Sequence, residues 1–261
     1  MIQRWFIAWL CSVAASAALA AEARLAIIID DLGNDYTMAQ HAMRLPAEVT
    51  LAVLPRLHYS KRIAAQAFKQ GHELILHQPM ASLANKALGP GGLTLVHGLN
   101  EMSQVLQQNL QSVPHVAGVN NHMGSLLTRD PDSMRWLMSA LQQHGGLYFI
   151  DSRTDTQTQA EIVARESGVA SARRDIFLDN ERDPALIREQ LAKAIQLARQ
   201  RGSAIAIGHP YPETLAVLLK ELPEWQKQGV VLLPVSKVIE HQRRPDSWHA
   251  SSYPLPKVAK N

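Results

Sequence analysis

Short apolar runs alternate with longer amphipathic segments along this chain of 261 residues, and this alternation constrains its fold most. Apolar runs of this length suit strands that are buried on both faces, as in a parallel sheet. Strands that alternate with helices predict a mostly parallel sheet covered by helices. About eight such units favour a (β/α) barrel, with an open doubly wound sheet as the alternative. The runs are Leu25–Ile29, Val49–Val53, Leu74–Leu76, Val116–Val119, Leu147–Ile150, Asp175–Leu178, Ala204–Ile207 and Val230–Leu233.

Two of the predicted helices have well-marked ends. Asp130 and Asp183 each precede a proline, and Gly145 and Gly202 follow the last residues of the two apolar patterns. Proline just inside the start of a helix and glycine just past its end is the usual asymmetry. Both acids are therefore predicted to cap helices and not to catalyse. Two further helices are predicted, Lys61–Gln70 and Asn100–Gln111.

The two ends of the chain are predicted to lie outside the folded domain. Residues 1–20 combine the positive Arg4, an apolar core and the small-residue site Ala18-Leu19-Ala20, which is the pattern of a secretory signal peptide. Residues 243–261 have no periodicity and are predicted to form a poorly ordered tail. Residues 21–242 then form the barrel domain.

Export through this signal predicts a periplasmic or secreted protein. No second hydrophobic span follows residue 20, so no membrane span is expected after cleavage. Cleavage would also remove Cys11, the one cysteine of the chain, which excludes thiol catalysis. The formal net charge of +3 is too weak to indicate nucleic-acid binding. Serine hydrolases of the Gly-x-Ser-x-Gly type are excluded because that motif is absent.

Polar residues follow most of the predicted strands. In barrels, the active site is built from the carboxyl ends of several strands. The first run ends in two adjacent acids, Asp30 and Asp31, and unpaired charge is costly to bury. Helix capping accounts for one of the two at most, so we predict a functional site here. The other residues at strand ends are His77, Asn120, Asn121, His122, Asp151, Asp179 and His209.

These residue types suit metal-assisted hydrolysis. One Asp and two His are a common ligand set for zinc and similar ions, and three protein ligands leave a position for water or substrate. The ion lowers the pKa of that water or polarises a carbonyl group. A further carboxylate can accept the proton of the water, and a further His can protonate the leaving group. Asp30, Asp31, His77, His122 and His209 suffice for these roles.

The two neighbouring acids impose a geometric condition. Adjacent residues of an extended strand point to opposite sides. Asp30 and Asp31 can therefore share one pocket only if the strand breaks at this point, and the Leu32-Gly33 sequence that follows favours such a break.

Five segments at the predicted strand ends form a recognisable set. They are Ile29–Gly33, the stretch from Gly71-His72-Glu73 to His77-Gln78-Pro79-Met80, Asn120–Ser125, Phe149–Thr154 and Ile207–Pro210. In this order they resemble the divergent polysaccharide deacetylase family, a distant branch of the NodB-homology carbohydrate esterases. The resemblance extends from about Arg24 to Gln242. It implies an α/β fold, an irregular (β/α) barrel of the polysaccharide deacetylase (NodB-homology) type, and metal-dependent removal of N- or O-acetyl groups from a glycan.

The resemblance also implies individual roles. In the wider superfamily the first motif supplies a base followed by a metal ligand, which would be Asp30 and Asp31. The second motif supplies two metal histidines four residues apart. The first matches His77, but Ala81 stands at the position of the second. His122 is expected to replace it, since it ends the next strand.

The remaining roles concern the acid and the substrate. The last motif makes His209 the general acid, and Asp151 is expected to orient His209 or to touch the substrate. Asn121, Met123, Gly124 and Arg153 are expected to bind the substrate. The Arg-Pro-Pro-Tyr motif, which carries substrate and oxyanion contacts in the superfamily, is absent from this region.

Three functional hypotheses follow. The first is a deacetylase that uses Zn²⁺ or another divalent cation and acts on an exported or cell-wall polysaccharide, with polysaccharide or peptidoglycan as its partner. The second is a catalytically impaired glycan-binding or scaffold protein of the cell envelope, which Ala81 and the missing motif favour. The third keeps the metal ion but hydrolyses an amide or a phosphoester.

Overall fold

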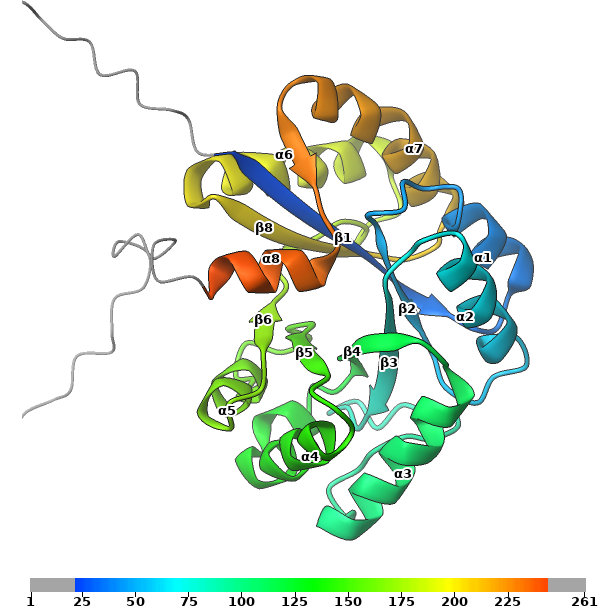
Figure 1. Ribbon diagram of the computed structural model, residues 1–261, viewed down its shortest axis with the longest axis vertical. Coiled ribbons are helices and arrows are strands. Elements are labelled where there is room, and N and C mark those ends of the chain that lie inside the picture. Colours follow the sequence, from blue (N-terminus) through cyan, green and yellow to red (C-terminus); the bar gives the residue numbers. More distant parts are fainter. Residues whose placement is uncertain (1–21, 244–261) are drawn as a thin grey trace, which may run out of the picture.

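The computed structural model describes residues 22–243, which form one curled parallel sheet surrounded by helices (Figure 1). Along the sheet the strand order is β6-β5-β4-β3-β2-β1-β8-β7, and β9 pairs with β1. This confirms the predicted irregular (β/α) barrel, and the doubly wound alternative is wrong. The strands are β1 (Ala23–Leu32), β2 (Thr50–Val53), β3 (Leu74–Met80), β4 (Val116–Met123), β5 (Tyr148–Asp151), β6 (Ser171–Arg173), β7 (Ile176–Phe177), β8 (Ser203–Gly208) and β9 (Val230–Leu232).

The two ends of this strand order are joined by a link of only two residues. β6 pairs with β5, β7 pairs with β8, and Arg174 and Asp175 lie between them. The backbone N–H of Arg174 donates to Asp151 O (2.9 Å), whereas that of Asp175 donates to Ile205 O (2.9 Å). The chain thus passes from one edge of the sheet to the other at this link, which brings the two edges of the curled sheet together.

Strand β1 is the centre of the sheet. One of its edges pairs with β8 from Arg24 to Ile29. The other edge pairs first with β9, at Ala23 to Leu25, and then with β2, at Ile28 to Leu32. With both edges occupied, β1 is a fully internal strand, and its apolar composition follows from that position.

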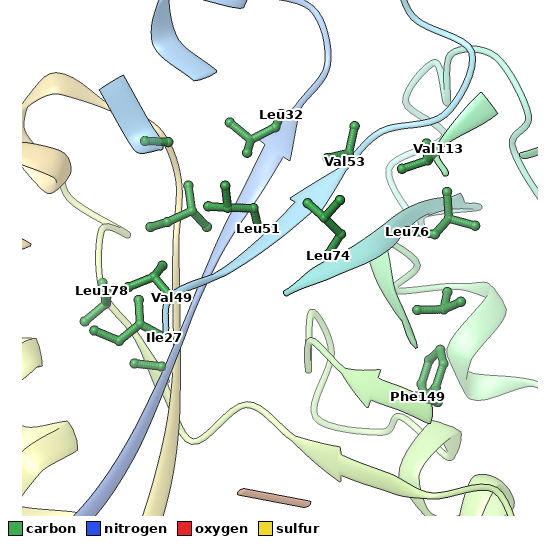
Figure 2. Packing of buried hydrophobic residues seen from close by; sticks show 14 of the residues in the cluster. Ile27, Leu32, Val49, Leu51, Val53, Leu74, Leu76, Val113, Phe149 and Leu178 are labelled. Carbon is green, nitrogen blue, oxygen red and sulfur yellow. The ribbon is translucent and has the colours of Figure 1, made fainter. Parts of the chain in front are cut away.

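Side chains of the strands alternate between two apolar clusters. Outward-facing residues such as Ile27, Leu51 and Leu74 pack in the cluster that the outer helices cover, and Figure 2 shows these three side chains on neighbouring strands. Ala26 and Ile28 belong to a second cluster inside the curl. This alternation decides which residues at the strand ends point into the barrel.

Eight α-helices lie within residues 22–243, and the outer ones surround the sheet (Figure 1). Asp130 and Asp183 cap α4 and α6, as predicted, through bonds from Ser133 N (2.8 Å) and Ala185 N (2.7 Å). The helices are α1 (Tyr36–Ala42), α2 (Ser60–Lys69), α3 (Leu99–Ser112), α4 (Pro131–Gln143), α5 (Ala160–Glu166), α6 (Pro184–Arg201), α7 (Pro212–Lys227) and α8 (Val235–Gln242).

Helix α8 covers the amino-terminal ends of the strands. Its residue Ile239 belongs to the inner cluster. Glu73, just before β3, accepts hydrogen bonds at Oε1 from Tyr148 OH (2.9 Å), Thr50 Oγ1 (3.1 Å) and Ser236 N (3.1 Å). A carboxylate at a helix N-terminus is favourable because it meets unpaired N–H groups. Helix α8 is therefore anchored over this end of the barrel, whereas the predicted site residues lie at the carboxyl ends of the strands.

The predicted signal peptide, residues 1–20, lies outside the described residues, as does nearly all of the predicted tail. No helix between residues 22 and 243 has the length and apolar character needed to cross a membrane.

A glycine in β4 tests this packing. Gly118 pairs with Tyr148, and an added Cβ would lie 2.3 Å from the Tyr148 ring, which its bond to Glu73 holds in place. Gly118→Ala should lower the free energy of unfolding by about 1–3 kcal/mol, measured by urea denaturation. In a Tyr148→Ala background the same change should cost much less, so additive losses would contradict this account.

Candidate metal centre

The two acids at the end of β1 reach the same side of the sheet because the strand breaks between them. Every second residue of β1, namely Ala26, Ile28 and Asp30, points into the barrel. In an extended conformation the next residue, Asp31, would therefore point outward. Asp31 instead has a left-handed backbone, with φ of 60°, and the β1–β2 register shifts between Ile29 and Leu32. The predicted break is confirmed. A non-glycine residue in this conformation costs on the order of 1 kcal/mol, which such sites tolerate for function.

Neither acid caps a helix. The following helix, α1, is capped by Asp35, whose Oδ1 accepts from Met38 N (3.0 Å). The capping interpretation of Asp30 and Asp31 is therefore wrong for both.

Asp31, His77 and His122 converge at the mouth of the barrel. Asp31 Oδ1 lies 3.0 Å from His77 Nε2 and 2.8 Å from His122 Nδ1. The two ring nitrogens lie 3.1 Å apart. Asp31 Oδ1 is buried, yet no hydrogen bond of acceptable geometry reaches it. Two ring nitrogens and one carboxylate oxygen, all with lone pairs, thus face one another. The carboxylate oxygen is buried and accepts no well-directed hydrogen bond.

A buried chain of hydrogen bonds fixes His77. Asn120 Nδ2 donates to Asp30 Oδ1 (2.8 Å), so its Oδ1 is left to accept from His77 Nδ1 (2.8 Å). The His77 proton is thereby held on Nδ1, and the Nε2 lone pair is directed towards Asp31 and His122. Such outer partners fix the tautomer and orientation of metal-binding histidines.

The donor set fits a small divalent cation. Two imidazole nitrogens and one carboxylate oxygen are ordinary zinc ligands, and they leave a fourth position open. Tetrahedral zinc bonds of about 2.0–2.1 Å separate neighbouring ligand atoms by roughly 3.3 Å. The three atoms lie slightly closer together here, at 2.8–3.1 Å. A small outward adjustment of the side chains would accommodate the ion.

Burial and charge act against each other on these groups. Burial raises the pKa of Asp31, but the His122 and His77 imidazoles outweigh it and hold that pKa well below its usual range. Burial lowers the pKa of His77, but Asp30 and Asp31 outweigh it and raise that pKa to about 9. For Asp30 burial dominates and the pKa is raised. The protonation states of these groups are therefore coupled. A bound cation would take the place of protons that they share.

Asp30 lies behind His77, on its Nδ1 side, with Oδ1 3.7 Å from that nitrogen. It is only 4% exposed. Its Oδ1 accepts from Asn120, whereas Oδ2 accepts no hydrogen bond among residues 22–243. The second oxygen is therefore available to accept a proton, and the predicted role of Asp30 as base stays a prediction.

His209 faces the cluster from β8, with Nε2 3.8 Å from Asp31 Oδ2. Its Nδ1 lies 2.9 Å from Asp179 Oδ1, and its backbone N–H donates to Asp179 Oδ2 (2.6 Å). Burial lowers the pKa of His209, but the Asp179 carboxylate outweighs it and raises that pKa. Asp179 thus holds the imidazole with Nε2 directed at the mouth of the barrel.

Asp151 was predicted to orient His209 or to touch the substrate; its hydrogen bonds do not reach His209, and its contact with a substrate stays a prediction. In β5, Tyr148 and Ile150 point inward, so Asp151 points towards the helices. Its oxygens accept from Arg153 N (2.8 Å) and Thr158 Oγ1 (2.9 Å), which stabilise its own loop. Burial raises its pKa. Asp151 therefore shapes the β5–α5 loop.

The predicted substrate-binding residues lie on the same rim. Asn121 is buried and connects two loops, since its side chain donates to Met123 O (2.7 Å) and accepts from Ser152 N (2.9 Å). Met123 and Arg153 have positive φ angles of 54° and 49°, and Gly124 one of 94°. These residues build sharp turns at the ends of β4 and β5, and their contact with a substrate stays a prediction.

Sequence analysis missed the roles of Asn120 and Asp179. Alternation could have found Asn120, because Gly118, Asn120 and His122 share the inward face of β4. Asp179 stands at a strand end like the other site residues, but only the closed curl of the sheet places it beside His209.

Comparison with known proteins relates this chain to one family. A sequence profile described as "Divergent polysaccharide deacetylase" matches residues 27–239. The uncharacterized protein YibQ of Escherichia coli K12 is 39% identical over 195 residues, which cover 75% of this chain and 61% of YibQ. The chain thus spans about three fifths of the length of that relative.

Two solved structures share the fold. The uncharacterized protein ATU2773 from Agrobacterium tumefaciens C58 matches with a TM-score of 0.80 and 25% identity, over 85% of this chain and 91% of that one. BA3943, described as a CE4 family pseudoenzyme from Bacillus anthracis, matches with a TM-score of 0.51 and 12% identity, over 84% and 66% of the two chains. The second likeness shows the fold alone.

The hydrogen-bond chain predicts the effect of one substitution. Asn120→Ala removes the acceptor that holds the His77 proton on Nδ1, so the affinity for a divalent ion should fall roughly 10- to 100-fold. The measurement is competition for Zn²⁺ against a chromophoric chelator. Asn180→Ala, at an exposed position, should bind Zn²⁺ as the unchanged protein does. Equal affinities in all three proteins would contradict the orienting role of Asn120.

Proposed function

The chain belongs to the divergent polysaccharide deacetylase family, and on that premise we propose that it is a metal-dependent hydrolase that removes acetyl groups from an exported or cell-wall polysaccharide. The convergence of Asp31 Oδ1, His77 Nε2 and His122 Nδ1 carries this proposal. Two further groups with opposite proton-transfer roles, Asp30 and His209, lie around the same mouth of the barrel. A binding pocket alone would not need that combination.

Asp31, His77 and His122 would hold the ion, which we propose to be Zn²⁺. When bound there, a divalent ion supplies Lewis-acid chemistry for hydrolysis at a carbonyl group. Asn120 keeps the Nε2 lone pair of His77 directed at the site. The carbohydrate class of the substrate and the export of the chain, through residues 1–20, are parts of this proposal.

The proton transfers are assigned to the other two groups. Water adds to the acetyl carbonyl, and Asp30 Oδ2 accepts the proton that the water loses. The C–N or C–O bond to the sugar then breaks, and the leaving atom receives a proton from His209 Nε2. The products are acetate and a free amine or hydroxyl group. Asp179 stabilises the protonated imidazole before this transfer, as the carboxylate partner of a catalytic histidine does.

A catalytically impaired scaffold protein is the second candidate. Ala81 supplies no ligand where the superfamily has its second metal histidine, and its backbone instead bonds to Leu93 O (2.9 Å) and accepts from Leu126 N and Leu127 N (3.1 Å each). The Arg-Pro-Pro-Tyr motif is also absent. His122 would answer the first objection, because its Nδ1 lies 3.1 Å from His77 Nε2 and could supply the second imidazole ligand.

Replacement of the base separates the two candidates. The Zn²⁺-loaded protein should release acetate from acetylated chito-oligosaccharides or peptidoglycan, and Asp30→Asn should reduce kcat by roughly 10²- to 10⁴-fold while it retains the ion. Asp132→Asn, at an exposed position of α4, is the matched control and should be fully active. If the unchanged protein binds Zn²⁺ but releases no acetate, the scaffold candidate is favoured.

Replacement of the carboxylate beside His209 tests the acid. Asp179 raises the pKa of His209, so Asp179→Asn should lower it. The acid must be protonated, and activity is lost as the pH rises through its pKa. The alkaline limb of the kcat/KM profile should therefore move to lower pH in Asp179→Asn. An unshifted alkaline limb would show that His209 is not the group that titrates there.

A further inference from the structure

Two arginines on the rim between β5 and β7 have no acidic partner. Arg174 Nε donates to Ser152 O (2.6 Å) and Nη2 donates to Arg153 O (2.8 Å), which places its guanidinium against the backbone of Arg153. In residues 22–243, no carboxylate oxygen lies within 4.0 Å of a guanidinium nitrogen of Arg153 or Arg174. Both side chains are partly buried.

Two other arginines near the rim are paired with acids. Arg129 Nη2 lies 2.6 Å from Asp155 Oδ2, and Arg182 Nη2 lies 3.2 Å from Glu213 Oε2. Arg153 and Arg174 lack such a carboxylate although both side chains are partly buried. Burial lowers the pKa of Arg174, and the nearby charge of Arg153 lowers it further.

Three acids, Asp30, Asp151 and Asp175, act on Arg174 through their charge, and the last two are already engaged by other groups. Both oxygens of Asp151 accept hydrogen bonds from its own loop. Asp175 Oδ2 accepts from Ile205 N (2.9 Å), and its Oδ1 lies 3.7 Å from Arg201 Nη1. They offset part of the charge at a distance but leave the guanidinium donors of the pair without a carboxylate.

A ring connects the pair to the candidate active site. The Arg174 guanidinium lies 4.9 Å from the centroid of the Phe177 ring. The same ring packs edge-on against His209, with centroids 5.4 Å apart. A group bound by the arginines would therefore lie one aromatic ring away from the residue assigned as the acid.

We propose that Arg153 and Arg174 form a subsite for a carboxylate, so that the substrate is an acetylated glycan whose sugars carry carboxylate groups. Guanidinium groups recognise planar carboxylates with paired hydrogen bonds. A partly buried cation without a partner is unfavourable, and a carboxylate of the ligand would supply that partner. Phe177 would place the neighbouring sugar ring beside His209. The reaction at that sugar rests on the proposed deacetylation, whereas the carboxylate subsite can be tested by binding alone.

Matched ligands test the subsite. The first pair is the alternating tetrasaccharide of N-acetylglucosamine and N-acetylmuramic acid, with its lactyl carboxylates free or converted to amides. The second pair is an acetylated oligomannuronate, again free or amidated. Binding is measured by isothermal titration calorimetry on the Zn²⁺-loaded Asp30→Asn chain, to avoid turnover. In at least one pair, which identifies the source of the carboxylate, the free form should bind about tenfold more tightly, as a charge-assisted contact predicts.

One variant decides the assignment. Arg153→Gln should remove most of that preference and leave the affinity for the amidated ligand within about twofold, because the Arg153 side chain forms no hydrogen bond or ion pair with any other residue between 22 and 243. Arg188→Gln, on the exposed face of α6, should keep the full preference. Arg174→Gln is a second variant, and a loss of folding there would leave the Arg153 result decisive. Equal binding of free and amidated forms in both pairs, or a preference that survives Arg153→Gln, would overturn the proposal.

The failure of the subsite and the failure of the proposed function give different results. Acetate release from neutral chito-oligosaccharides without any preference for carboxylates would reject the subsite alone. A carboxylate preference that depends on Arg153, without acetate release from either pair, would support the subsite and reject the deacetylase.

Discussion

The backbone at Asp31 is the constraint on which the candidate site depends. β1 is held on both edges by three strands, so its side chains alternate strictly up to Asp30. A single left-handed residue then brings Asp31 to the inner side. Gly33, with φ of 140°, allows the chain to turn away after the end of β1. A Cβ at this position would lie 3.2 Å from Leu54 O. Two adjacent acids can face one mouth of the barrel only because of this local distortion.

The polar side chains of the candidate site face the inside of the barrel. Asp30, His77 and Asn120 succeed apolar residues on the inward faces of β1, β3 and β4, so the polar site lies directly on an apolar interior. Asn120 connects Asp30, the proposed base, to a proposed metal ligand, His77, through two hydrogen bonds of 2.8 Å. Buried polar networks of this kind are rigid when every member is satisfied. The other end of the barrel is covered by α8, which the hydrogen bond from Ser236 N to Glu73 holds in place.

Hydrophobic periodicity was sufficient to predict a parallel sheet covered by helices, its longer strands and the caps at Asp130 and Asp183, whereas the choice of a barrel over a doubly wound sheet also rested on the family resemblance. It did not predict β6, because Ser171–Arg173 has no apolar character and is a strand only through its partner β5. The helices α1, α5, α7 and α8 were also not predicted. Strand ends correctly indicated Asp31, His77, His122 and His209 as neighbours.

The errors at the site have one physical source. A strand end was treated as a position on the rim without regard to which face its side chain occupies. Alternation from Tyr148 and Ile150 places Asp151 on the outer face, so it could not reach His209. The partnership of Asp179 with His209 depends on the β6–β7 link that brings the sheet edges together, and no local pattern in the sequence reports that closure.

The proposed metal centre is tested most directly by diffraction from crystals of the Zn²⁺-loaded protein at the zinc absorption edge. The account predicts one anomalous peak at roughly 2.0–2.2 Å from each of Asp31 Oδ1, His77 Nε2 and His122 Nδ1, with Asp30 close to the ion but outside its ligand sphere. An ion bound by other residues, or no peak between these three side chains at saturating Zn²⁺, would contradict it.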